Sequence, residues 1–161
     1  MKEISVVIDC SGSMASLSKR DIVQSAVRNL LLHENFSFDF YSWSLSVSAL
    51  PYDEVSALSL EFGGKTDINA LLHFLESKIA ERKKSVVLVT DGFFDGNTEN
   101  LRTFQRETPD LKLRLLGVGA DFSETSAQFF FPKDFVVEKK ENLIFSASDL
   151  EALLFSFYED L

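Results

Sequence analysis

Three separate segments of the chain carry acidic or hydroxyl side chains at spacings that suit metal binding. In the first segment Asp9, Ser11 and Ser13 alternate, so an extended loop would direct all three side chains to one side. Carboxylate and hydroxyl oxygens are the ligands that a hard divalent cation such as Mg²⁺ prefers, and Mn²⁺ accepts the same set. The expected metal ligands are Asp9, Ser11, Ser13, Thr66 and Asp91.

The charge of this ligand set indicates what the site would recognise. Two carboxylates just neutralise a divalent cation, and hydroxyl groups add no charge. If one carboxylate binds through water, the first coordination shell keeps a net positive charge and attracts an anionic ligand. We therefore expect a carboxylate of a protein partner to complete the coordination, which favours protein recognition over ion storage.

The hydrophobic pattern predicts the elements that must position these residues. Strand-like apolar runs alternate with segments of helical spacing, which predicts a doubly wound α/β fold with helices on both faces of a mostly parallel central sheet. Two strictly alternating segments, 36–40 and 45–49, predict a hairpin and therefore one antiparallel edge strand. The other expected strands are 4–8, 86–89, 111–118 and 135–137. Helices are expected at 18–31, 66–79, around 101–104, at 123–130 and at 148–158, with capping boxes at 18–21 and 148–151.

The polar segments stand at the ends of these predicted elements. Ligands of such sheets bind beyond the carboxyl ends of the strands, where the strand order reverses. Asp9 follows the strand 4–8, Asp91 lies just beyond the strand 86–89, and Thr66 opens a helix. The sequence therefore predicts that the three segments converge at one edge of the sheet.

Composition narrows the class of protein. The chain has 161 residues, which fits one domain over 1–161, and its net charge of −9 argues against a non-specific binder of nucleic acid or anionic membranes. Its one cysteine, Cys10, excludes an internal disulfide and is expected to be a buried thiol. We find no candidate leader or transmembrane run, and we expect a cytoplasmic protein.

Four segments resemble the von Willebrand factor type A domain. That family carries a metal-ion-dependent adhesion site with an Asp-x-Ser-x-Ser loop, a separate Thr and a separate Asp. The sequence DCSGSM at 9–14 matches the first element, and VLVTDG at 87–92 matches the last. GGKTDI at 63–68 resembles the threonine element, and LLGVG at 115–119 resembles a later strand of the family. The resemblance runs over nearly the whole chain.

The resemblance implies a non-enzymatic module that binds a Glu or Asp of a protein partner through Mg²⁺ or Mn²⁺. It also implies a multi-protein system, with an AAA-type ATPase as one possible partner, and a shift of the C-terminal helix on binding. Lys65 differs from the family pattern, because it interrupts the glycine-rich stretch that precedes the threonine. Together with Phe93 and Phe94, which follow the third segment, it forms the expected partner-binding rim, although burial of the two aromatic rings is an open alternative.

Other interpretations of the same residues stay open. In a haloacid dehalogenase-like phosphohydrolase Asp9 would be the nucleophile, but Ser11 stands where that superfamily has its general acid. A flavodoxin-like phosphate loop would use the two serines of the first segment and would leave Thr66 and Asp91 unexplained. Thr66 or Asp67 could also simply cap a helix.

Overall fold

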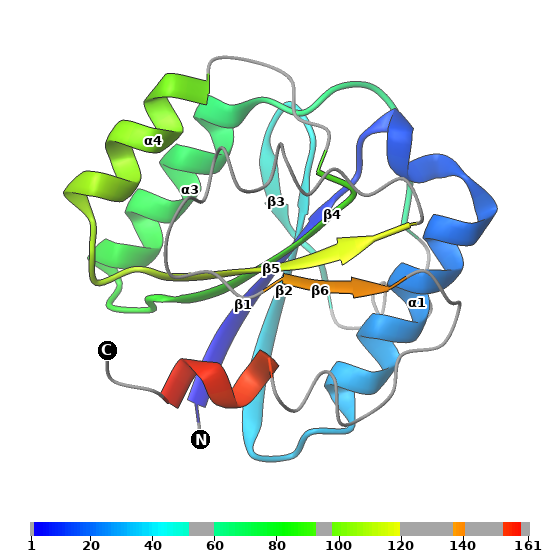
Figure 1. Cartoon of the computed structure of the whole chain (residues 1–161), viewed down its shortest axis with the longest axis horizontal. Helices are drawn as coiled ribbons and strands as arrows, with labels where there is room; N and C mark the ends of the chain where they lie inside the picture. The colour runs from blue at the N-terminus through cyan, green and yellow to red at the C-terminus, as the bar shows by residue number, and fades with distance from the viewer. Residues whose placement is uncertain (1, 52–59, 93–97, 120–136, 141–152, 159–161) are drawn as a thin grey trace.

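A six-stranded sheet runs through the centre of the molecule (Figure 1). The computed structural model describes residues 2–51, 60–92, 98–119, 137–140 and 153–158. The strand order is β3-β2-β1-β4-β5-β6, and every pair is parallel except the edge pair β2–β3, as predicted. The strands are β1 (Lys2–Asp9), β2 (Phe36–Trp43), β3 (Val47–Ala49), β4 (Ser85–Thr90), β5 (Lys112–Val118) and β6 (Val137–Lys140).

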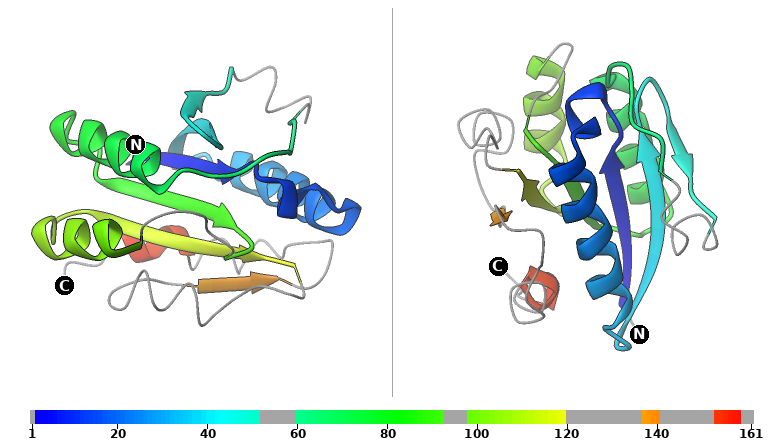
Figure 2. Two further views of the ribbon diagram at one scale, coloured as in Figure 1. Left: turned by 90° about the horizontal axis from the view of Figure 1, so that it is seen from above. Right: turned by 90° about the vertical axis from the view of Figure 1, so that its right-hand side faces the viewer.

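Helices cover both faces of this sheet (Figure 2). The helix α1 (Leu17–Leu31) packs on one face, together with the C-terminal segment that ends in the 3-10 helix η2 (Ser156–Tyr158). The helices α3 (Ile68–Ala80) and α4 (Thr98–Glu107) pack on the other face. The doubly wound α/β fold expected from the alternation of elements is therefore confirmed.

The central strands are apolar because both of their faces are covered. In β1 the side chains of Ile4, Val6 and Ile8 belong to the core beneath α1, whereas Val7 belongs to the core beneath α3. All six residues of β4 are buried. A continuous β-branched run is typical of a strand buried between two helical layers, which is why the hydrophobic pattern predicts both strands.

The strand order reverses between β1 and β4. From β1 the chain crosses through α1 to β2 on one side, and it later returns to β4 on the other side. Asp9 ends β1 and Thr90 ends β4, so both residues lie at the carboxyl edge of the sheet next to this reversal. The topology thus places the predicted site where ligands of open α/β sheets bind.

The start of α1 and the bounds of β6 differ from what the sequence predicts. The helix α1 begins at Leu17 with Ser16 as its N-cap, so the expected capping box at 18–21 is wrong. The last strand, Val137–Lys140, includes Val137 of the expected strand 135–137 and continues beyond it, and residues 135–136 lie outside the described part of the chain. The predicted helix at 123–130 and the capping box at 148–151 lie outside the described residues, whereas 153–158 is helical as expected.

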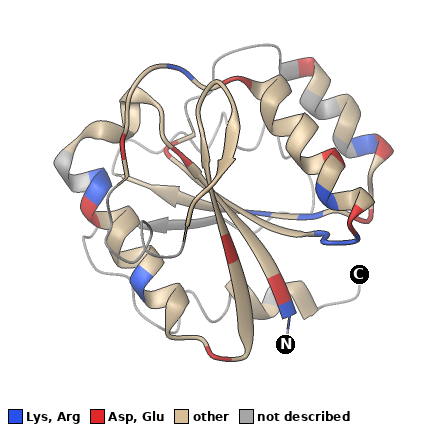
Figure 3. Ribbon diagram, turned by 180° about the vertical axis from the view of Figure 1, so that it is seen from behind, with Lys and Arg blue, Asp and Glu red and all other residues tan. Residues whose placement is uncertain are grey.

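Acidic and basic side chains are mixed along the helices. Figure 3 shows Lys or Arg as well as Asp or Glu on each of α1, α3 and α4. None of these three helices therefore carries a purely basic stripe of the kind that binds polyanions. Over the described part of the chain, no helix has the length and apolar character needed to span a membrane.

Candidate metal centre

The loop after β1 holds three of the expected ligands. Asp9 Oδ1 accepts a hydrogen bond from the backbone N–H of Ser11 over 2.9 Å. The 3-10 helix η1 (Gly12–Ala15) follows at once, and Ser11 Oγ lies 3.1 Å from Ser13 Oγ. Asp9 and Ser11 are buried, whereas Ser13 is exposed. The two serine hydroxyls therefore lie together, with one of them at the protein surface.

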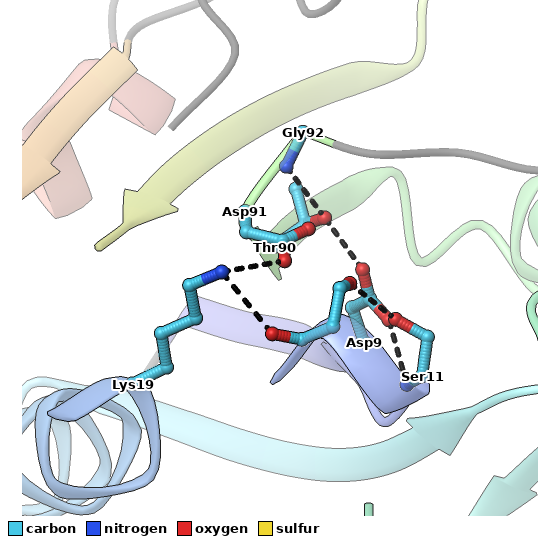
Figure 4. Close-up of polar contacts among 7 residues, drawn as sticks. Asp9, Ser11, Lys19, Thr90, Asp91 and Gly92 are labelled. Carbon is cyan, nitrogen blue, oxygen red and sulfur yellow. Dashed lines mark hydrogen bonds and ion pairs between the residues drawn. The ribbon is translucent and has the colours of Figure 1, made fainter. Parts of the chain in front are cut away.

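The end of β4 connects directly to this loop. The hydroxyl of Thr90 donates a hydrogen bond to Asp9 Oδ2 over 2.7 Å and accepts one from the backbone N–H of Gly92 over 3.1 Å (Figure 4). Gly92 has a φ of 84°, which favours glycine. Asp9 and Asp91 are both 0% exposed. Thr90 thus links the Asp9 carboxylate at the end of β1 to the backbone turn that follows β4.

The segment 63–66, which precedes α3, is joined to the loop after β1 by two backbone hydrogen bonds. Gly12 N donates to Gly64 O and Gly63 N donates to Cys10 O, each over 2.9 Å. Thr66 follows in this segment and is buried, and its Oγ1 has no hydrogen-bond partner among the described residues. A buried polar atom without a partner costs free energy, so this hydroxyl has an oxygen available to a bound ion or an ordered water.

Asp67 caps the helix that follows Thr66. Its side chain accepts a hydrogen bond from Asn69 N over 2.9 Å. The Asp67 backbone donates to Ser44 O and accepts a hydrogen bond from Trp43 Nε1, which anchors the segment to the end of β2. Asp67 is therefore the N-cap of α3, and the Thr66 side chain does not cap this helix.

Sequence reasoning missed two residues of this centre. Lys19 lies in α1, and its Nζ is 3.1 Å from Asp91 Oδ2 and 3.1 Å from the carbonyl oxygen of Ser13. Thr90 positions Asp9 as described above. A hydroxyl between the apolar run 86–89 and Asp91 was a signal for Thr90. No signal pointed to Lys19, whose place in the sequence suggested only a helix start.

Burial controls the ionisation of this centre. Desolvation raises the pKa of Asp9 to about 6, and the negative charge of Asp91 adds to the effect. Hydrogen bonds from Ser11 and Thr90 act in the opposite direction. Desolvation likewise raises the pKa of Cys10 to about 12, which keeps it an unreactive buried thiol, in line with its expected burial.

The donor set fits a hard divalent cation. It offers carboxylate and hydroxyl oxygens, the ligand type that such cations prefer. The described residues contain no group of three or more His, Cys, Asp or Glu that could hold a metal ion, so hydroxyl oxygens would have to complete the ligand set. Thr66 Oγ1 supplies an oxygen that nothing else in the described structure uses. Of the expected rim, Lys65 is exposed, and Phe93 and Phe94 lie outside the described residues.

Comparisons with known proteins gave matches only among solved structures. No family model matches the chain, and no curated protein matches its sequence. An aerotolerance-related membrane protein from Bacteroides fragilis, in a form with multiple mutations to serine, matches with a TM-score of 0.70 and 16% identity over 98% of this chain and 99% of that one.

Two further matches are with named domains. A von Willebrand factor type A protein from Catenulispora acidiphila has a TM-score of 0.69 and 16% identity, covering 99% of this chain and 43% of that one. The SpRpn10 VWA domain has a TM-score of 0.65 and 11% identity over 94% of each chain. At such identities the likeness concerns the fold. The chain therefore has the fold of the von Willebrand factor type A domains.

Proposed function

We propose that the chain is a protein-interaction module with a metal-ion-dependent adhesion site, which binds an acidic side chain of a partner through a divalent cation. The observation that carries this proposal is the buried, unpaired hydroxyl of Thr66, in a segment hydrogen-bonded to the loop that contains the serine ligands. The residues that would hold Mg²⁺ or Mn²⁺ are Asp9, Ser11, Ser13, Thr66 and Asp91.

The residues of the proposed site have different roles. Thr90 and the Ser11 backbone N–H orient the Asp9 carboxylate by hydrogen bonds to its two oxygens. Ser13, at the surface, would be the ligand nearest to an incoming partner. A bound divalent cation would supply the positive charge that attracts a carboxylate. Exposed Lys65 would lie on the rim, where its charge also favours an acidic partner.

The partner in this proposal is a protein that offers a Glu or Asp, with an AAA-type ATPase of a multi-protein system as one candidate. Two observations support the class of partner: the fold is that of the type A domains, and the net charge of −9 disfavours nucleic acid and anionic membranes. A cytoplasmic setting agrees with a single buried cysteine that needs no oxidising compartment.

The phosphohydrolase alternative is less well supported. A nucleophilic carboxylate needs an accessible oxygen, but Asp9 is fully buried and both of its oxygens accept hydrogen bonds. The position of the general acid is occupied by Ser11, whose hydroxyl lies against Ser13. We therefore propose a binding role rather than a catalytic one.

Calorimetric titration with Mg²⁺ and Mn²⁺ tests the proposed site. The variant Thr66→Val removes one oxygen at nearly constant volume, and we expect it to weaken binding about tenfold or more, which corresponds to about 1.4 kcal/mol or more. Thr103→Val makes the same change at an exposed position of α4 and should leave the affinity unchanged. Equal affinities for the wild type and Thr66→Val would refute the assignment of Thr66.

A further inference from the structure

A lysine ammonium lies on one of the carboxylates proposed to bind the metal. Lys19 Nζ is 3.1 Å from Asp91 Oδ2, and Lys19 is only 7% exposed (Figure 4). The same nitrogen donates to the carbonyl oxygen of Ser13 over 3.1 Å, so it joins the β4 end to the β1 loop. Lys19 stands in the first turn of α1, whose backbone fixes the origin of the side chain.

The Lys19 ammonium group holds the Asp91 carboxylate and the loop after β1 together, as a bound metal ion would also do. An ammonium supplies positive charge to a buried carboxylate, and its N–H groups bridge two segments that a cation would also bridge. A buried charge is tolerated only when it is paired, so the ion pair lowers the cost of placing Asp91 at 0% exposure beside Asp9. One oxygen of Asp91 therefore has a resident positive partner already.

We propose that Lys19 is a tethered cation that competes with the divalent metal for Asp91. The inference rests on the proposed function, since it concerns the same site. The ion pair holds the β1 loop and the β4 end together in the absence of metal, and metal binding releases it. When a binding-competent state must first be formed by breaking a contact, the apparent affinity falls by the fraction of that state. Lys19 thus weakens metal binding and keeps the centre ordered without metal.

Titration of the Lys19→Met variant with Mg²⁺ tests this competition. We expect the variant to bind Mg²⁺ about tenfold more tightly than the wild type, which corresponds to about 1.4 kcal/mol. Lys83→Met is the matched control, because it removes the same charge from a half-buried lysine that pairs with Glu3 and Asp39 at the other end of the sheet. We expect its Mg²⁺ affinity to equal that of the wild type.

The outcomes separate the two proposals. If the wild type binds Mg²⁺ and Lys19→Met binds it equally or more weakly, the competition is refuted and the proposed function stands. If neither protein binds Mg²⁺ or Mn²⁺, both proposals fail. If only Lys19→Met binds, the competition is supported, and the metal-dependent function of the natural chain is refuted.

A second measurement uses the wild-type protein and does not depend on the folding of a variant. Amine-reactive labelling read by mass spectrometry should modify Lys19 slowly without metal and several-fold faster with saturating Mg²⁺, as the ammonium leaves the buried pair. Lys83 should react at the same rate in both conditions. Unchanged labelling of Lys19 in a protein shown to bind Mg²⁺ would overturn the proposal.

Discussion

Asp9 is the residue whose ionisation the fold opposes. It is fully buried, and desolvation raises its pKa from 3.8 to about 6 despite the hydrogen bonds from Ser11 and Thr90. The nearby Asp91 charge adds to this effect, and Asp91 itself forms an ion pair with Lys19. The centre therefore carries an electrostatic cost that a divalent cation would offset.

This cost predicts a pH-dependent stability in the presence of chelator. A carboxyl whose folded pKa lies above its unfolded value stabilises the fold at low pH, and that contribution is lost as the pH rises through about 6. Relative to Asp9→Asn, the wild type should lose roughly 2 kcal/mol of unfolding free energy between about pH 4 and pH 7.5. Denaturant unfolding across this range measures the difference. Asp110→Asn, at an exposed position, should retain the wild-type slope, and the same slope in Asp9→Asn would contradict the prediction.

The spacing of residues in the sequence predicted the five candidate metal ligands, but it did not predict the contacts of Lys19 and Thr90. The candidate ligands were evident because three of them alternate within one loop and the others border predicted elements. The pairing of Lys19 with Asp91 joins residues 72 apart, and the bond from Thr90 to Asp9 spans 81 residues. Such contacts depend on how distant elements pack, which a local pattern does not encode.

At the scale of elements, the segment before α3 sets the place of Thr66. Its two backbone hydrogen bonds to the β1 loop require a turn, and Gly64 has a φ of 75°, in the left-handed region. Gly63 has no such constraint, and a Cβ added there would meet nothing within 4 Å. The turn therefore requires glycine at position 64 but not at position 63.

The pair offers a matched test of this turn. Gly64→Ala should lower the unfolding free energy by about 1–2 kcal/mol, the cost of the left-handed conformation for a residue with a Cβ. It should also weaken Mg²⁺ binding, because the backbone that carries Thr66 must relax. Gly63→Ala should be nearly neutral in both thermal unfolding and calorimetry. Equal effects of the two substitutions would argue against the turn as the positioning device.

Periodicity identified most elements, and its errors have local causes. The helix α1 starts at Leu17 rather than at the predicted capping box, because η1 ends directly before it and Ser16, in an extended conformation, takes the N-cap position. The strand β6 continues past Val137, the expected last residue, to Lys140 because its pairing with β5 extends that far. Strand propensity depends on the partner strand as much as on the residues themselves.

At the scale of the whole molecule, the strand order creates the site. The alternation of elements predicted the fold class and the antiparallel edge, and both agree with the structure. It did not specify that β1 lies between β2 and β4, which brings the end of the first strand next to the end of the fourth. This adjacency brings together acidic residues that lie far apart in the sequence, and it makes a shared cation site possible.

The most direct test of the central claim is a crystal soaked in Mn²⁺ and measured for anomalous scattering. We expect one strong peak beyond the carboxyl ends of β1 and β4, bordered by oxygens of Asp9, Ser11, Ser13, Thr66 and Asp91. Oxygen distances near those typical of such hard cations, about 2.0–2.4 Å, are expected. A saturating soak that gives no peak there, or a peak only at a distant surface carboxylate, would show that these five residues do not share a cation.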